Sequence, residues 1–103
     1  MKVTITKLAE ENLYATADYI QENFGNKVAM EFLQEFRHTI QLLEGYPQLG
    51  PTEPLLTMFP SEYRSVVIKR LTKMVYRILE DHIEIADIWD CRREPKTLAN
   101  EIE

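Results

Sequence analysis

The chain has 103 residues, of which 45% are hydrophobic and 28% charged, and its formal net charge is −5. This length predicts a single domain over residues 1–103 with one core, and the negative charge argues against a protein that binds nucleic acid with its whole surface. No apolar run approaches the ~18 to 20 residues of a membrane-spanning helix, and the lone Cys91 cannot form an internal disulfide. We therefore expect a cytoplasmic protein that makes no contact with a membrane.

The first half of the chain predicts a strand followed by two helices. Residues 2–6 alternate polar and apolar side chains, and Thr6 can cap the helix that follows. Gly25 suits the end of that helix, and Asn26 can cap a second helix that stops at Gly45. Both helices are amphipathic, with apolar stripes formed by Leu13, Ala17, Ile20 and Phe24, and by Ala29, Phe32, Leu33, Phe36, Ile40 and Leu43. So short a turn between two long helices implies an antiparallel hairpin.

The second half predicts a sheet. Residues 47–61 are rich in proline and form an irregular connection. Strand-like runs follow at 63–69, 73–80 and 82–89, with separations short enough for an antiparallel meander. The element order β-α-α-β-β-β therefore predicts an α+β fold of two layers, with an antiparallel helical hairpin packed on a mostly antiparallel four-stranded sheet. The expected core includes Ile20, Phe32, Phe36, Ile40 and Tyr76.

Basic residues concentrate in the predicted sheet. Between Tyr63 and Arg77 the chain has five basic residues and no acid. Alternation along the run 73–80 points Tyr76 toward the helices and leaves Lys73 and Arg77 on the open face of the sheet. The run 63–69 does not itself decide whether Arg64 joins them.

Two interpretations of these cations stay open. If Arg64 shares the open face and the last strand brings Arg92 and Arg93 to the same rim, cations from three strands converge. Such a rim would suit a phosphate backbone or an acidic protein. In the other interpretation each cation is solvated and paired with an acid, such as Glu62, Glu84 or Asp87.

Other candidate sites are weaker. His38 and His82 have no second ligand at metal spacing, so we expect neither a metal nor a cofactor. Cys91 is expected to be a semi-buried thiol, and Asp87 and Asp90 are expected to orient the arginines. The chain contains no phosphate-binding glycine loop and no nucleophile motif.

Four stretches in order resemble the RelE/ParE toxins of bacterial toxin–antitoxin modules. They are "LYATADYIQENFGNKVAMEFLQEFRHTIQLLEGYPQLG", "YRSVVI", "KMVYRILEDHIEIADIW" and "DCRREP". The resemblance implies a small toxin of the plasmid-stabilisation type that arrests growth. It also implies a cognate antitoxin whose C-terminal segment covers the toxin's functional surface, and operator DNA contacts made only through that antitoxin. RelE-like members cleave messenger RNA in the ribosomal A site with basic residues on the open sheet face, whereas ParE-like members inhibit DNA gyrase.

Matched residue by residue, the chain has only part of the nuclease set. Arg64 and Lys73 stand where the nuclease branch has basic residues, and Arg93 (or Arg92) matches its arginine after the last strand. Val66 replaces a second lysine, and the tail after Arg93 contains neither Tyr nor His. RNA cleavage needs a group that moves protons, which arginine supplies poorly.

Three functions remain as candidates, in order of expectation. The first is a ParE-like gyrase inhibitor, which is not an enzyme. The second is a RelE-like endoribonuclease acting on the ribosome and messenger RNA, with Arg64, Lys73 and Arg93 as candidate catalytic residues. The third is a degenerate toxin that only binds its antitoxin as a co-repressor. In each case the functional basic rim and antitoxin contact is expected at Arg64, Lys73, Arg77, Arg92 and Arg93.

Overall fold

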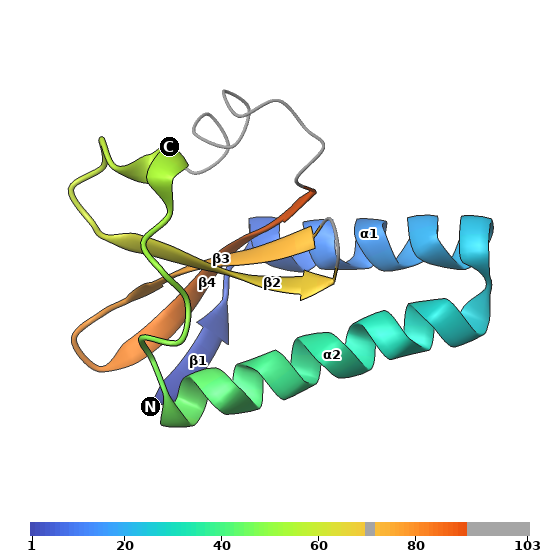
Figure 1. The fold of residues 1–103 in the computed structure, drawn as a ribbon, viewed down its shortest axis with the longest axis horizontal. Coiled ribbons are helices and arrows are strands. Elements are labelled where there is room, and N and C mark those ends of the chain that lie inside the picture. The colour runs from blue at the N-terminus through green and yellow to red at the C-terminus, as the bar shows by residue number, and fades with distance from the viewer. Residues whose placement is uncertain (70–71, 91–103) are drawn as a thin grey trace.

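The computed structural model describes residues 1–69 and 72–90, which form two layers (Figure 1). The elements are β1 (Lys2–Ile5), α1 (Lys7–Phe24), α2 (Asn26–Gly45), a short 3-10 helix η1 (Pro54–Leu56), β2 (Tyr63–Lys69), β3 (Thr72–Ile78) and β4 (His82–Asp90). The predicted order of elements and the α+β class are confirmed. None of the described helices has an apolar stretch that could cross a bilayer.

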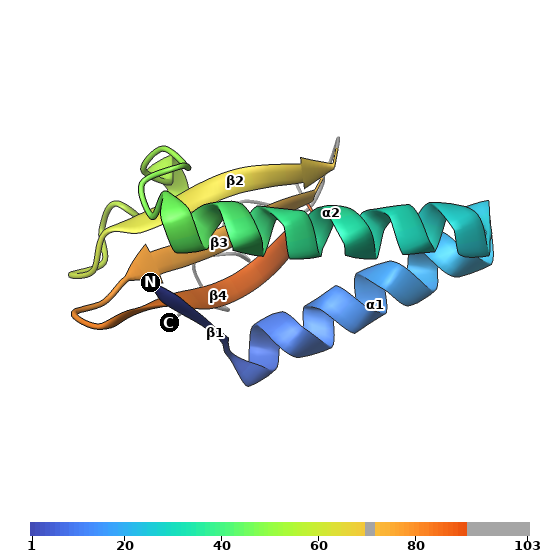
Figure 2. The ribbon, with the colours of Figure 1, turned by 90° about the horizontal axis from the view of Figure 1, so that it is seen from below.

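The four strands form one sheet in the order β1-β4-β3-β2. Strands β2, β3 and β4 are antiparallel neighbours, as predicted, and β1 pairs with β4 in parallel, with Val3 opposite Ile83. Both helices lie on one face of this sheet, and the tip of their hairpin projects beyond the ends of the strands (Figures 1 and 2). The hairpin tip is therefore not supported by the sheet.

The helix ends agree with the sequence in one case and differ in another. The Thr6 hydroxyl accepts a hydrogen bond from the Ala9 N–H at 3.1 Å, so Thr6 caps α1 as predicted. Gly25 has a φ of 92° and ends α1, but it also begins α2. The prediction that Asn26 caps α2 was wrong, because the turn is a single residue and Asn26 is already helical. Its side chain instead accepts a hydrogen bond from Gln21.

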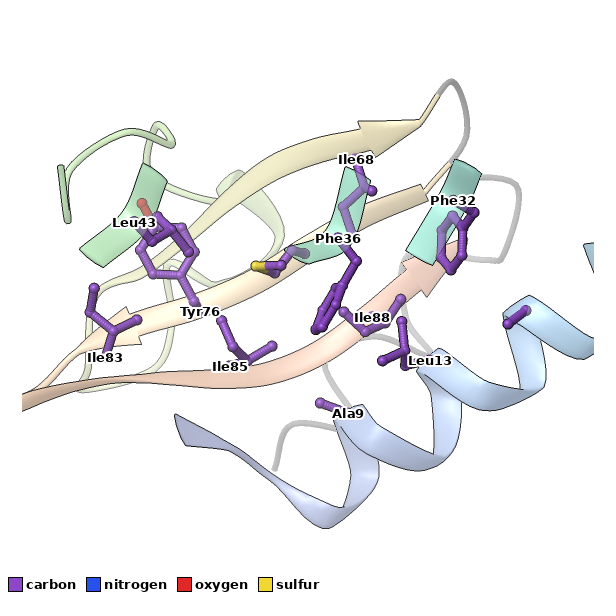
Figure 3. Close-up of a cluster of buried hydrophobic side chains, with 12 residues drawn as sticks. Ala9, Leu13, Phe32, Phe36, Leu43, Ile68, Tyr76, Ile83, Ile85 and Ile88 are labelled. Atoms are coloured by element: carbon purple, nitrogen blue, oxygen red, sulfur yellow. The ribbon is translucent and has the colours of Figure 1, made fainter. Parts of the chain in front are cut away.

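The main core lies between the helices and the sheet (Figure 3). Phe32, Phe36 and Tyr76 are buried there, as predicted, while Ile20 and Ile40 are partly buried and pack against them. Phe24 is 63% exposed and does not join the core. It is the last residue of α1, at the hairpin tip, where the apolar stripe continues past the edge of the sheet.

A second apolar cluster lies on the opposite face of the sheet. Alternation along the strands places Tyr63, Val75 and Trp89 on this face, and all three are buried. Leu56 covers them, with further packing from Leu55 and Phe59. We call residues 51–61 the covering segment and this side of the sheet the covered face. The expectation of an open face was wrong, because the proline-rich connection folds back onto it.

Candidate functional site

The predicted cations divide between the two faces of the sheet. Residues directly opposite one another in an antiparallel pair share a face. Arg64 lies opposite Tyr76, which faces the helices, whereas Lys73 and Arg77 alternate with Tyr76 and lie on the covered face. Of the two alternatives left open for Arg64, the one in which it shares a face with Lys73 is therefore excluded. Alternation places Ile68 on the same side of β2 as Arg64. Because Ile68 is buried in the core beneath the helices, this side of the strand, including Arg64, faces them.

Three of the predicted rim residues, Arg64, Lys73 and Arg77, lie in the described part of the chain, and each is within ion-pair distance of an acid. The pairs are Lys73 Nζ to Glu53 Oε1 at 2.6 Å, Arg77 Nε to Glu84 Oε1 at 3.0 Å and Arg64 Nη2 to Glu62 Oε1 at 3.0 Å. For these three residues the arrangement agrees with the interpretation in which each cation is paired with an acid. Arg92 and Arg93 lie outside the described residues, as does Cys91.

Glu53 is a partner that the sequence did not indicate. Its side chain is 2% exposed, and its second carboxylate oxygen accepts a hydrogen bond from the Ser65 hydroxyl at 2.6 Å. The backbone holds it there, because the Glu53 N–H donates to the Tyr63 carbonyl at 2.8 Å and the Ser65 N–H donates to the Pro51 carbonyl at 3.0 Å. The start of the covering segment thus runs beside β2 like an additional short strand.

Arg64 contributes to the turn that leads into the covering segment. Its guanidinium donates to the Gly50 carbonyl at 2.8 Å, and the Tyr76 hydroxyl donates to the Pro47 carbonyl at 2.8 Å while accepting from the Gly50 N–H at 2.9 Å. Burial raises the pKa of Tyr76, and the Gly50 hydrogen bond and the Arg64 charge only partly oppose that rise. A Cβ on Gly50 would lie 2.3 Å from the Ser65 carbonyl oxygen, so the turn requires glycine. Arg64 therefore has a structural role here.

Arg77 and Asp87 are also held in place. The Arg77 guanidinium donates to the Ser61 hydroxyl at 2.9 Å and lies over the Tyr63 ring, 5.7 Å from its centre. Asp87 is buried and accepts hydrogen bonds from the Asn12 side chain at 2.7 Å and from a backbone N–H at 2.8 Å. The Asn12 contact ties α1 to β4.

A groove that the sequence analysis missed lies on the helix side of the sheet. It has a volume of about 740 Å³ and is lined by residues of α1, α2 and the adjacent ends of β2, β3 and β4. Its apolar lining combines the exposed side chains of Tyr19, Phe24 and Val28 with the buried Phe32 and Ile88. The signal available in the sequence was the apolar stripe of α1, which continues to Phe24.

Metal and histidine chemistry receive no support in the part of the chain that the structure describes. Within residues 1–69 and 72–90, no group of three His, Cys, Asp or Glu side chains could hold a metal ion. His82 is the first residue of β4, and its ring nitrogen is 2.6 Å from the Asp81 carboxylate. That hydrogen bond lowers the pKa of Asp81.

The fold is that of bacterial toxin–antitoxin proteins. A chain from a chromosomal ParDE toxin–antitoxin system of P. aeruginosa has a TM-score of 0.71 at 21% identity, covering 87% of this chain and 95% of that one. A YoeB dimer from Staphylococcus aureus gives a TM-score of 0.58, also at 21% identity, covering 84% and 92%. The family model for the ParE toxin of the type II toxin–antitoxin system parDE matches residues 3–95, and the chain therefore belongs to the ParE toxin family. A search of curated proteins gave no significant match.

Proposed function

We propose that this protein is the toxin of a type II toxin–antitoxin module, that it inhibits DNA gyrase, and that a cognate antitoxin neutralises it. The observation that carries the choice of gyrase over messenger RNA is the covered face. RelE-like members use basic residues on an open sheet face, whereas here the covering segment lies over that face and Lys73 is bound to the buried Glu53. Arg64 lies on the other face of the sheet.

His82 is not placed to move a proton beside Lys73, and the Glu53 carboxylate found there is already bound by Lys73 and Ser65. RNA cleavage needs a group that activates the 2′-hydroxyl and another that protonates the leaving oxygen. His82 begins β4 and Trp89, which lies opposite Lys73, is seven residues further along the strand, or ~23 Å at 3.3 Å per residue. A nuclease site that combines Lys73 with His82 is therefore not supported.

We further propose that the antitoxin segment docks in the groove at the hairpin tip. Exposed apolar side chains in a groove are typical of a helix-binding surface, where an amphipathic helix buries one face. The hairpin is acidic, with Glu10, Glu11, Asp18, Glu22, Glu31, Glu35 and Glu44 against Lys7, Lys27 and Arg37. The occupant is thus an amphipathic helix that carries basic side chains beside its apolar face. Contact of the antitoxin with Arg64, Lys73, Arg77, Arg92 and Arg93 stays a prediction.

The target can be tested with the purified protein. We expect it to block DNA supercoiling by gyrase, to leave ribosome-bound messenger RNA intact, and to lose its effect when the product of the neighbouring gene is added. Cleavage of the message without an effect on supercoiling would refute the gyrase proposal. Expression without a partner is expected to arrest growth, and normal growth with verified soluble protein would favour the degenerate toxin.

Docking in the groove can be tested with two matched substitutions on α1. Phe24 and Tyr14 are both exposed aromatic residues, at 63% and 58%, but only Phe24 lines the groove. Phe24→Arg removes an apolar contact and adds a charge that repels a basic helix, so we expect antitoxin affinity to fall at least ~10-fold. Tyr14→Arg should leave affinity within about 2-fold, since surface positions outside an interface carry little binding energy. Equal losses in the two variants would place the antitoxin elsewhere.

A further inference from the structure

The carboxylate of Glu53 occupies a site formed by two donors of the sheet. Lys73 Nζ reaches one oxygen at 2.6 Å, and the Ser65 hydroxyl reaches the other at 2.6 Å. The two donors come from neighbouring strands, β3 and β2, whereas the acceptor comes from the covering segment. The sheet thus supplies an ammonium and a hydroxyl, and the covering segment supplies the anion between them.

These donors are of the kind that hold phosphate oxygens. A lysine ammonium binds phosphate as a point charge, and a hydroxyl can donate to another oxygen of the same group. Without the Glu53 side chain, Lys73 and Ser65 would be two converging donors with no acceptor between them. A carboxylate here therefore stands where one edge of a phosphate group could bind.

Stability alone does not explain why this site is ionic. Replacing a buried ion pair with well-packed apolar residues is often neutral or stabilising, so such a pair is weak evidence for a stabilising role. The surrounding residues are already apolar, since Leu56, Val75 and Trp89 pack on the same face. An apolar side chain at position 53 would fit that environment, but it would leave the Lys73 charge without a partner.

From this geometry we infer that Lys73 and Ser65 form an oxyanion site of the phosphate class, and that Glu53 closes it as a built-in competitor. The covering segment keeps the carboxylate in place through the Glu53 N–H and the Pro51 carbonyl. In the native protein the site excludes phosphate groups, including those of a nucleic-acid backbone. This inference concerns anion binding and does not depend on the identity of the toxin's target.

The test uses inorganic phosphate as the ligand and Glu53→Ala as the opened site. At constant ionic strength, phosphate at ten times its Kd should raise the Tm of Glu53→Ala by roughly 5 °C relative to chloride. The wild-type protein should show no such rise, because its site is filled. The double variant Glu53→Ala/Lys73→Met should also show none, because it lacks the ammonium.

Several results would overturn the inference. One is a folded Glu53→Ala protein whose Tm responds to phosphate no more than wild type, and another is an equal response in the double variant. Glu53→Ser also leaves the space of the carboxylate open and serves if the alanine variant is unfolded in chloride. Failure of both variants to fold even in phosphate would also count against the site, since a bound anion there should restore the fold.

Discussion

Replacing Lys73 with methionine tests how strongly the buried carboxylate of Glu53 depends on its cation. The Glu53 side chain is 2% exposed, and the Lys73 side chain is 15% exposed. In the variant one carboxylate oxygen loses its partner at 2.6 Å, and the Ser65 hydroxyl still serves the other. Breaking a buried pair from one side leaves an uncompensated charge, so we expect the free energy of unfolding to fall by about 3 to 5 kcal/mol.

Changing the acid instead should have a smaller effect. After Glu53→Gln the amide can still accept from Ser65, and the Lys73 ammonium, on a flexible stem with partial exposure, can turn toward water. We expect a loss of about 1 to 3 kcal/mol. The double variant Glu53→Leu/Lys73→Met removes both charges, and its free energy of unfolding should lie within about 1 kcal/mol of the wild-type value. The effects of the two substitutions on the free energy of unfolding would then be strongly coupled rather than additive.

Urea unfolding followed by the fluorescence of Trp89 provides the assay. Trp89 is the only tryptophan of the chain and is buried under the covering segment. Glu62→Gln is the matched control, because Glu62 pairs with Arg64 but is 62% exposed and should change stability by less than about 1 kcal/mol. A loss for Lys73→Met no larger than that of Glu62→Gln, or smaller than that of Glu53→Gln, would refute this reasoning.

Three further changes test the packing around this site. Phe36→Ala should lower the free energy of unfolding by about 3 to 5 kcal/mol in urea, because Phe36 is only 7% exposed. Gly50→Ala should lower it by about 1 to 3 kcal/mol, since its Cβ would meet a backbone oxygen at 2.3 Å, while Gly45→Ala, with nothing within 4 Å, should not destabilise. Burial raises the pKa of Tyr76, so the wild-type protein should lose stability as pH rises above about 10, the unfolded value, and through the folded one. Tyr76→Phe should abolish this alkaline loss, although it should cost about 1 to 3 kcal/mol at neutral pH by leaving two backbone groups without their partner.

The sequence predicts the layers of this fold because periodicity is a local property. Helical spacing identified both α1 and α2, and alternation along β3 turned Tyr76 toward the helices correctly. Alternation fails in β2, where apolar residues occupy both sets of positions, so the face of Arg64 could not be chosen. Only the pairing with β3 decides it, and that pairing is a tertiary contact.

The covering segment was missed for a different reason. A proline-rich connection has no periodicity, and its contacts join it to residues far along the chain, such as Glu53 to Lys73, twenty positions apart. The groove was missed because the stripe of α1 does not reveal where the sheet ends. Phe24 fits the apolar pattern, but it lies on the unsupported hairpin tip and is exposed.

The parallel pairing of β1 with β4 sets the order in which the protein can fold. Lys2 pairs with His82, and the Thr6 hydroxyl donates to the Ala86 carbonyl across 80 positions of the chain. During synthesis α1 and α2 can form early from local contacts, whereas β1 must wait until β4 has been made. The groove includes Ile88 of β4 as well as residues of both helices, so it too is complete only at this last stage. If the antitoxin docks in this groove, as proposed, it can bind only after the toxin chain has been completed and has folded.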